Sequence, residues 1–451
     1  MSDAKPHGSI LGWNTIVLYG SPATGPSLLY MWILLFYMNF ATDVLLVAPQ
    51  VIGTIFLVSK LWDAISDPIA GYLSDRTRSR FGRRRSWMLG SAIPISAAAI
   101  MMWAPPEALK GSALALWIGV GVFIFYTAYT AYYVPHLSLG SELAIENNDR
   151  NRIFAARNIA YQIGLLLSVL GGVYVFSGED PRSNGALLAL GVGAITTLGI
   201  IGAALRLPSE PSRPEQGGGQ SLLSSMRDVT SNPHARILLF VFLIESIGLG
   251  ATGTMTPYAV KYIVKDESIL GPVMLASFAP AMLTIPIWVR LARRYERHHL
   301  WMISMVIAAC GYGCLFFLDE GRTWLMFCSS LFTGTSMGCS STLGHAIKAD
   351  VIDHDEYMTG ERKDGSYFAA LAFISKLGSG VMLGLSGWML GASGFVPNIE
   401  QTDATRTAIV FFMGGAPVLG FFLGLIAMTR FTLNRAEHAR IRQALDSRNS
   451  A

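Results

Sequence analysis

Two aspartates, Asp63 and Asp67, lie four residues apart inside a long apolar stretch of the chain. If that stretch is a helix, both carboxylates face the same side, one turn apart. A rise of about 1.5 Å per residue places Asp63 roughly 18 Å inward from the basic segment that begins near Asp75. This depth is close to the middle of a hydrocarbon core about 30 Å thick, where carboxylates are costly and by default functional. The pair therefore indicates a cation site.

Two carboxylates in a low-dielectric surrounding repel each other, so at least one must be protonated, paired or bound to an ion. Oxygen ligands suit alkali and alkaline-earth cations better than soft metals do. A proton carried by the pair is the competing interpretation, and simple pairing of the acids with other helices is the third.

A second isolated charge is Lys376, in a later apolar stretch. We expect its ammonium to pair with Asp63 or Asp67 when no ion is bound, so that ion binding loosens the pair and favours closure around a solute. The alternative is a lysine near a cytoplasmic helix end that has no part in coupling.

The composition indicates that these residues lie in a membrane protein. Of 451 residues, 52% are hydrophobic and 14% are charged, whereas a soluble chain carries about a quarter charged residues. Apolar stretches near the length of a spanning helix recur about twelve times, and they are too long for barrel strands. The predicted fold class is an all-α integral membrane protein.

Basic segments predict the orientation. Arginines crowd residues 75–85 and 290–299, whereas opposite-side loops such as 177–180 and 398–400 are acidic or mixed. The positive-inside rule places both basic segments and both termini in the cytoplasm. Since orientation accounts for the arginines, the net charge of +4 predicts no nucleic-acid partner.

A Pro/Gly/Ser-rich segment divides the chain into two halves of about six helices each. We predict a first bundle over 1–206, a cytoplasmic linker over 207–233, a second bundle over 234–431 and a cytoplasmic tail over 432–451. The halves share a Pro-Ile pair before the basic segment, at Pro68 and Pro286. Two parallel repeats of this kind are typical of a transporter that works by rocking.

Several motifs resemble a known family. The stretch 71–76 followed by Gly82-Arg83-Arg84 resembles the helix 2–3 loop motif of the major facilitator superfamily. The stretches 62–68 and 78–83 resemble, more narrowly, the glycoside–pentoside–hexuronide:cation symporters, which include melibiose permease and the sodium-dependent lysophosphatidylcholine symporter. Further matches lie in Val134-Pro135, 350–353, 359–362 and Lys376.

This resemblance implies a major facilitator fold and a sodium site. It adds the Thr130 hydroxyl to Asp63 and Asp67, with Ser66 standing where the family often has Asn. Arg157 matches an arginine that lies beside the substrate in sugar-transporting relatives, although a membrane-surface anchor is the other interpretation. Glu245 is expected to contact solute, carry a proton or pair with a basic loop. Ion pairs between the halves at a cytoplasmic gate are expected from Asp75, Arg76, Arg83, Glu142, Asp350 and Asp353, with simple solvation as the alternative.

Positions at which this chain differs from the sugar transporters of the family indicate the kind of solute. Relatives that carry galactosides have acidic residues at the positions of Ser27 and Tyr133, and losing these hydroxyl acceptors argues against a tight galactoside site. Tyrosines such as Tyr129, together with Trp62, leave an aromatic lining with polar tips. Such a lining suits an aryl glycoside, a steroid-like molecule or an amphiphile such as a lysolipid, although packing of helices is the other use of these rings.

An enzyme is not expected, because no nucleophile, acid–base or metal constellation gathers at one depth of the membrane. A non-transporting sensor would have little need of a coupling ion. The sequence therefore predicts a monomeric, sodium-coupled symporter of a small organic solute or amphiphile in a bacterial inner membrane. A proton-coupled carrier or a membrane sensor is the alternative. No cofactor other than the coupling ion is expected, and the lipid bilayer is the other partner.

Overall fold

The computed structural model describes residues 11–144, 147–208 and 222–449, and these residues form helices and loops without any strand. This confirms the predicted all-α class. Within the described residues, nine helical segments are long and apolar enough to cross a membrane. They are Arg83–Trp103, Gly111–Leu143, Asp149–Phe176, Pro181–Arg206, Pro233–Val264, Glu267–Leu291, Arg297–Phe317, Asp364–Ala392 and Asp403–Met428.

Three further helical stretches are of similar length but are broken or charged. Residues 13–43 include a proline-containing turn and a π-helical turn, and residues 323–359 contain the π-helical turn Ser340–Gly344. The third, α4 (Pro49–Arg76), contains the two aspartates and Pro68. With these three, the structure agrees with the prediction of about twelve spans.

The described residues form two compact units, and α4 passes from one to the other between Ala64 and Ile65. The remaining helices of the first unit are α1 (Trp13–Gly20), α2 (Thr24–Trp32), α5 (Arg83–Trp103), α6 (Gly111–Leu143), α7 (Asn147–Phe176) and α8 (Pro181–Arg206). Those of the second unit are α3 (Met38–Asp43), α9 (Leu222–Ser231), α10 (Pro233–Ala259), α11 (Leu270–Leu283), α12 (Ile285–Leu291), α13 (Arg297–Cys314), α14 (Thr323–Cys339), α15 (His345–Thr359), α16 (Asp364–Ala392), α17 (Asp403–Val410), α18 (Ala416–Met428) and α19 (Arg435–Asn449).

The units follow the chain order with one exception. Met38–Ala64, although it belongs to the first half of the sequence, packs with the second unit. Of the predicted linker over 207–233, residues 209–221 lie outside the described residues, and α9 occupies most of the remainder. The predicted tail contains α19, and its last two residues also lie outside the described range.

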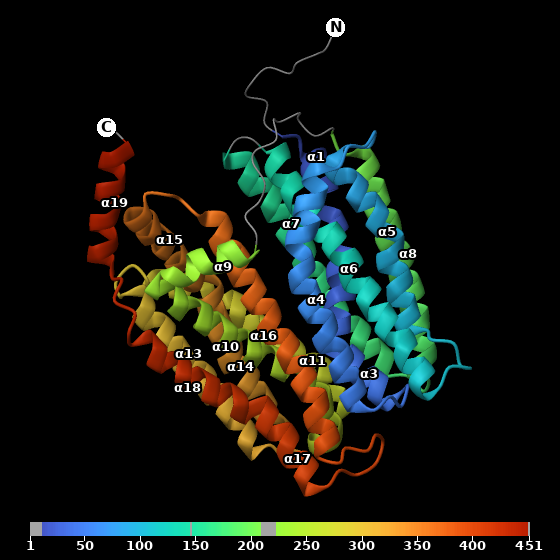
Figure 1. The fold of residues 1–451 in the computed structure, drawn as a ribbon. Helices are drawn as coiled ribbons and strands as arrows, with labels where there is room; N and C mark the ends of the chain where they lie inside the picture. Colours follow the sequence, from blue (N-terminus) through green and yellow to red (C-terminus); the bar gives the residue numbers. More distant parts are fainter. Residues whose placement is uncertain (1–10, 145–146, 209–221, 450–451) are drawn as a thin grey trace. The chain divides into compact units, whose positions relative to one another are not determined.

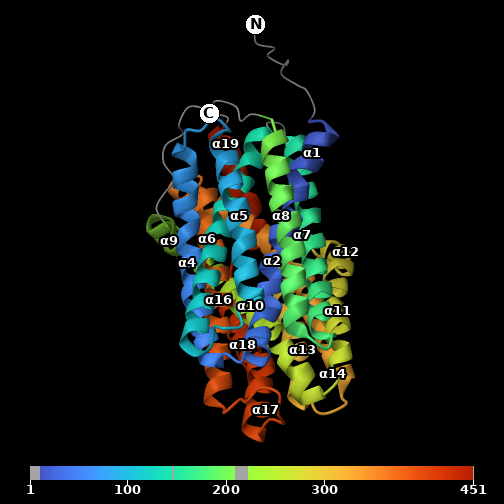
Figure 2. The same cartoon turned by 90° about the vertical axis from the view of Figure 1, so that its right-hand side faces the viewer.

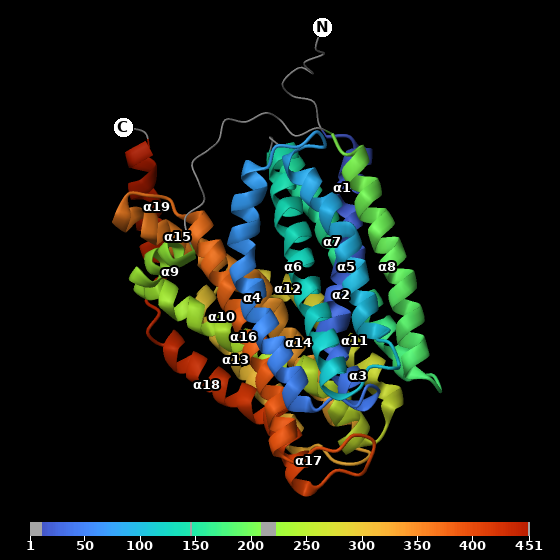
Figure 3. The same ribbon diagram turned by 45° about the vertical axis from the view of Figure 1, so that its right-hand side comes forward.

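In the first unit, α5 lies between α6 and α8 (Figures 1 and 3). The Ser96 hydroxyl of α5 donates to the Gly193 carbonyl of α8 at 2.8 Å. The indole rings of Trp32 and Trp103 stack with centroids 3.8 Å apart and thereby join α2 to α5. Helix α7 packs against α2 and also contacts α8 (Figure 2). These contacts fix the positions of α2, α6 and α7 within the first unit.

In the second unit, α10 packs against α16 and α18, and α13 packs against α14 and α18 (Figure 1). Residues 38–64 enter this unit through a close approach of α4 and α16. A Cβ atom added at Gly380, Gly384 or Gly387 would lie 2.5 Å from Lys60 Cβ, 2.8 Å from Leu57 Cβ or 2.7 Å from Gly53 Cα, respectively. These three residues, the glycine stripe, let the two backbones touch. Lys376 lies one turn before Gly380 on α16, so it faces the side of α4 that the glycine stripe contacts.

Replacing Gly387 by Ala should lower the melting temperature of the purified protein. The new Cβ meets backbone atoms of Pro49 and Gly53, which cannot rotate away. Overpacking of this kind costs about 1–3 kcal/mol. The matched control is Gly365→Ala on the same helix, where an added Cβ has no atom within 4 Å. Equal melting temperatures for the two variants would refute the close approach.

Candidate functional site

Helix α4 carries both aspartates of the sequence motif. Asp63 is fully buried and Asp67 is partly buried, one turn further along. Pro68 follows Asp67 inside the helix and has no N–H to donate to the carbonyl of Ala64. A backbone carbonyl without its usual helical donor thus lies in the turn between the two carboxylates. The local sequence therefore concentrates oxygen atoms along one side of α4.

In the second unit, Lys376 of α16 approaches Asp63. The ammonium Nζ donates to Asp63 Oδ1 at 3.0 Å, and the Lys376 side chain is 17% exposed while Asp63 is 0% exposed. Lys60, one turn earlier on α4, places its Nζ 3.7 Å from Asp63 Oδ2. Asp63 and Lys376 were predicted from the sequence, whereas Lys60 was overlooked. The lysine three residues before a buried aspartate was the available signal.

In the first unit, Thr130 of α6 joins Asp67 to Ser66. The Thr130 hydroxyl donates to Asp67 Oδ1 at 3.0 Å, and the Ser66 hydroxyl donates to Thr130 Oγ1 at 3.2 Å. Ser66 and Thr130 are buried. No group of three or more His, Cys, Asp or Glu side chains able to hold a metal occurs in the described part of the chain. Hydroxyl and carboxylate oxygens remain, and this donor set fits a hard alkali cation better than a transition metal.

The predicted gate residues of the first unit form ion pairs near the end of α4. Arg83 Nη2 lies 2.6 Å from Glu142 Oε1, and Arg84 Nη2 lies 3.2 Å from the same oxygen. Arg84 also pairs with Asp75. Arg76 stacks over the Tyr72 ring instead, 3.7 Å from its centroid. These contacts connect α4, α5 and α6 within one unit, and a role between the halves stays a prediction.

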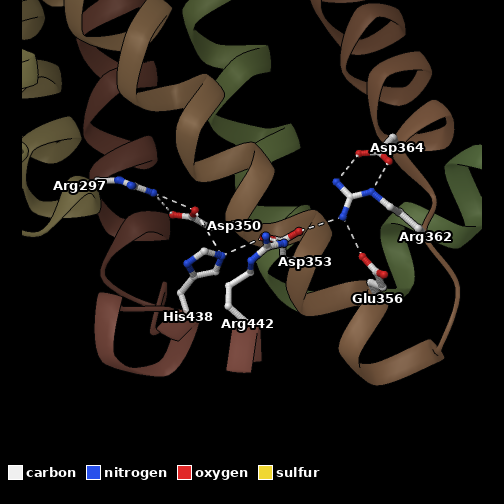
Figure 4. Close-up of polar contacts among 8 residues, drawn as sticks. All are labelled: Arg297, Asp350, Asp353, Glu356, Arg362, Asp364, His438 and Arg442. Carbon is white, nitrogen blue, oxygen red and sulfur yellow. Dashed lines mark hydrogen bonds and ion pairs between the residues drawn. The ribbon is translucent and has the colours of Figure 1, made fainter. Parts of the chain in front are cut away.

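The corresponding residues of the second unit lie in a larger network (Figure 4). Asp350 accepts from Arg297 at 2.6 and 2.8 Å, and Asp353 accepts from Arg362 at 3.1 Å. His438 of α19 lies 3.0 Å from Asp353 Oδ2, so the C-terminal helix is tied to α15. Hydrogen bonds to carboxylates, above all to Asp364, raise the pKa of Arg362 above its usual value.

Arg157 lies within α7, after the polar residues at the start of this helix. Helix α7 begins at Asn147, and the polar residues before Ile153 belong to it. Ten residues at about 1.5 Å each place Arg157 roughly 15 Å along the helix. Its guanidinium lies 5.0 Å from the centroid of the Tyr133 ring. Both interpretations of Arg157, beside the solute or at the membrane surface, stay predictions.

The predicted aromatic residues gather around the same part of the first unit. Tyr129 stacks on Tyr133 with centroids 5.6 Å apart and on Tyr30 at 4.6 Å. Ser27 is buried and donates to the Tyr161 carbonyl at 3.2 Å, one turn beyond Arg157. Trp62, which was also predicted, is partly buried on α4 and belongs to the second unit. The structure therefore brings together Ser27, Tyr129, Tyr133 and Arg157.

Glu245 of α10 is held by neutral donors. Trp301 Nε1 donates to its Oε1 at 2.9 Å, and the Ser340 hydroxyl donates to its Oε2 at 2.5 Å. Ser340 opens the π-helical turn Ser340–Gly344. No lysine or arginine within the described residues pairs with Glu245. We expected Glu245 to contact solute, carry a proton or pair with a basic loop. The described residues do not show the third of these.

A second buried carboxylate, Asp43, was missed. Its Oδ2 accepts from Lys261 at 2.6 Å and from the Tyr262 hydroxyl at 2.5 Å. The side chain of Asn398 donates to the backbone carbonyl of Asp43 at 2.9 Å. A lone acid in the apolar run 28–48 was the signal for this site. These bonds link α3 to the π-helical turn that follows α10 and to the loop before α17.

Changing Glu142 to Gln should destabilise the protein, because the side chains of Arg83 and Arg84 would lose the carboxylate that neutralises them. Removing one partner of a partly buried ion pair costs about 1–3 kcal/mol after allowance for solvent screening. Thermal melts of the purified protein measure this change, with the exposed Glu361→Gln as control. A Glu142→Gln protein as stable as that control would show that the cluster adds nothing.

Comparison with known proteins agrees with this fold and these motifs. Residues 18–435 match the family described as MFS/sugar transport protein. The isoprimeverose transporter of Lactiplantibacillus pentosus is 24% identical, over 96% of this chain and 91% of its own. The glucuronide carrier protein homolog of Escherichia coli strain K12 is 23% identical, over 92% of each chain.

Among solved structures, the nucleoside transporter NupG has the same fold. Its TM-score is 0.67 at 16% sequence identity, over 93% of this chain and 100% of its own. The apolar helices and these matches establish a multi-pass membrane transporter and not an enzyme. The chain belongs to the MFS/sugar transport protein family of the major facilitator superfamily, and it resembles the glycoside–pentoside–hexuronide:cation symporters.

Proposed function

We propose that this symporter uses sodium to drive uptake of a glycoside-type solute across a bacterial inner membrane by alternating access. The observation that carries the proposal is the buried carboxylate of Asp63, held 3.0 Å from the Lys376 ammonium. A carboxylate with a displaceable cationic partner is suited to exchange that partner for a coupling ion. The membrane potential contributes about 2.3 kcal/mol per charge per 100 mV to such uptake.

The ion ligands would be Asp63 and Asp67 of α4, assisted by Ser66 and Thr130. Thr130 and Ser66 already form a chain of hydroxyls on Asp67, at 3.0 and 3.2 Å. A sodium ion would take the place of the hydrogen bonds among these oxygens: each hydroxyl would keep its proton and turn a lone pair toward the ion, which needs only a rotation about its C–O bond. No other cofactor is required, and a single chain is the proposed transporting unit.

A glycoside is favoured over a lysolipid or steroid as solute. The two relatives named above are, by their names, carriers of isoprimeverose and of a glucuronide. The tyrosines of α6 offer flat ring faces with hydroxyl tips, an arrangement that suits the faces and edges of a sugar ring. Sodium-dependent uptake of lysophosphatidylcholine and of no sugar would instead select the amphiphile.

Asp63→Asn and Asp67→Asn should each abolish the stimulation of uptake by sodium while the protein still folds in the membrane. Each change removes a negative charge that the ion needs and keeps the size of the side chain. Uptake of a radiolabelled glycoside into proteoliposomes, with and without a sodium gradient, measures the effect. Melting temperatures measured with and without sodium report sodium binding separately from uptake.

The matched control is Glu107→Gln, which removes an exposed carboxylate from a loop of the first unit. It should retain wild-type stimulation. If the aspartate variants respond to sodium as wild type does, the proposed ion site is wrong. A wild-type protein stimulated by a proton gradient and not by sodium would make the same residues a protonation site.

Lys376→Ala should uncouple uptake from the ion gradient. Without the Lys376 ammonium, Asp63 keeps only Lys60 of its own helix, so ion binding loses its link to the position of α16. Sodium should then still raise the melting temperature, but a sodium gradient should increase the initial uptake rate by less than about half of the wild-type effect. Unaltered coupling in this variant would remove Lys376 from the mechanism.

A further inference from the structure

Helix α15 carries three carboxylates on one face near its C-terminal end. Asp350, Asp353 and Glu356 follow one another at three-residue intervals, and the helix ends at Thr359. Side chains three residues apart are neighbours on a helix, so these negative charges repel one another. The negative end of the helix dipole adds to the repulsion. Cations from other segments are therefore needed to stabilise this face.

Two arginines supply part of that positive charge. Arg297, the first residue of α13, pairs with Asp350 at 2.6 Å, and Arg362 pairs with the other two carboxylates at 2.8 and 3.1 Å. Arg362 also pairs at 2.7 Å with Asp364, the first residue of α16. Four carboxylates thus face two guanidinium groups, and negative charge remains in excess (Figure 4).

The C-terminal helix α19 adds two further donors to this network (Figure 4). Arg442 Nη1 lies 3.5 Å from Asp353 Oδ2, and His438 Nε2 lies 3.0 Å from the same oxygen. Since an ionised carboxylate can only accept, the imidazole donates to it. The side chain of Asp353 is 10% exposed. It is therefore bound through one oxygen by α19 and through the other by Arg362.

Other contacts hold α19 against the second unit along its length. At its start, Arg435 donates to three backbone carbonyls of the loop between α12 and α13. Ile441 and Leu445 are buried. Near its end, Arg448 donates to the Tyr357 carbonyl at 3.2 Å. Helix α19 thus connects the α12–α13 loop to the last turn of α15.

The same network reaches α16, the helix that bears Lys376. Asp353 binds Arg362, and Arg362 in turn binds Asp364 in the first turn of α16. Gly360 adopts a φ of 75°, in the left-handed region, where α15 ends and the short loop to α16 begins. A change in the position of α16 must therefore break these ion pairs or move α15 as well.

Building on the proposed symport, in which ion binding changes the position of α16, we propose that α19 is a brake on transport. Through Asp353 and Arg362, α19 holds the first turn of α16 and slows its movement. Release of α19 leaves four carboxylates with two arginines, and their repulsion loosens the connection between α15 and α16. The brake contains none of the proposed ion ligands, so it acts on the rate of uptake and not on affinity.

Hydrogen exchange of the purified full chain in nanodiscs tests the contact. The double variant His438→Phe/Arg442→Gln removes both α19 donors to Asp353 and keeps the size of the side chains. Amides of α19 and of the first two turns of α16 should exchange about fivefold faster than in wild type. The matched control is Arg440→Gln, which removes an arginine of α19 that is 80% exposed and pairs with Glu437 of the same helix. It should exchange as wild type does.

Uptake of the glycoside into proteoliposomes under a sodium gradient tests the effect on transport. The initial rate at saturating glycoside should rise about twofold to fivefold in the double variant, with KM changed by less than about twofold. Restoring the charge at one position, as His438→Phe/Arg442→Lys, should return part of the slower rate. A purely structural role of α19 would instead lower the melting temperature and the rate together.

Unchanged exchange in the first turns of α16 would overturn the inference. So would an uptake rate equal to or below that of wild type in a variant whose α19 exchanges faster. If the double variant does not fold, Arg442→Gln alone replaces it in both measurements. Absence of sodium-stimulated uptake by wild type would reject the proposed symport, and the exchange comparison would then decide by itself whether α19 restrains α16.

Discussion

The cost of placing a charge among apolar helices governs this structure. Each ionised side chain in a spanning segment must find an opposite charge, a set of dipoles or a ligand, or its burial is unfavourable by several kcal/mol. Asp63 forms an ion pair with Lys376, Asp43 with Lys261, and Glu142 with two arginines. Helix packing brings the partners of these ion pairs together. The Asp63–Lys376 pair depends on the close approach of α16 to α4 at the glycine stripe.

The motifs that carry charge were predictable from the sequence, because a charged residue inside an apolar run is conspicuous. Asp63, Asp67 and Lys376 were found in this way, as were about twelve spans. Lys60 was hidden by its closeness to Asp63, and its reach to that carboxylate depends on the side-chain direction in α4.

The approach of α4 to α16 could not be predicted from the sequence for a different reason. Glycines are common in spanning helices, and their spacing along α16 shows a smooth face without showing which helix it meets. The inclusion of Met38–Ala64 in the second unit likewise depends on tertiary contacts, which the sequence does not show. Similarly, sequence alone showed that Ser27 and Tyr133 are uncharged, but only the structure shows that Arg157 lies among neutral rings.

The pairing of Lys376 with Asp63 bears on how coupling can be both selective and reversible. A bare carboxylate at this depth would hold sodium strongly, and its release would then be slow. An ammonium that returns as the ion departs replaces one positive charge by another, so the electrostatic cost of losing the ion is largely offset. Under that mechanism, the energy that distinguishes the two states would reside in the position of α16, which bears Lys376 and contacts α4 along the glycine stripe. Under the proposed mechanism, the ion therefore acts by releasing a helix and not by attracting the solute directly.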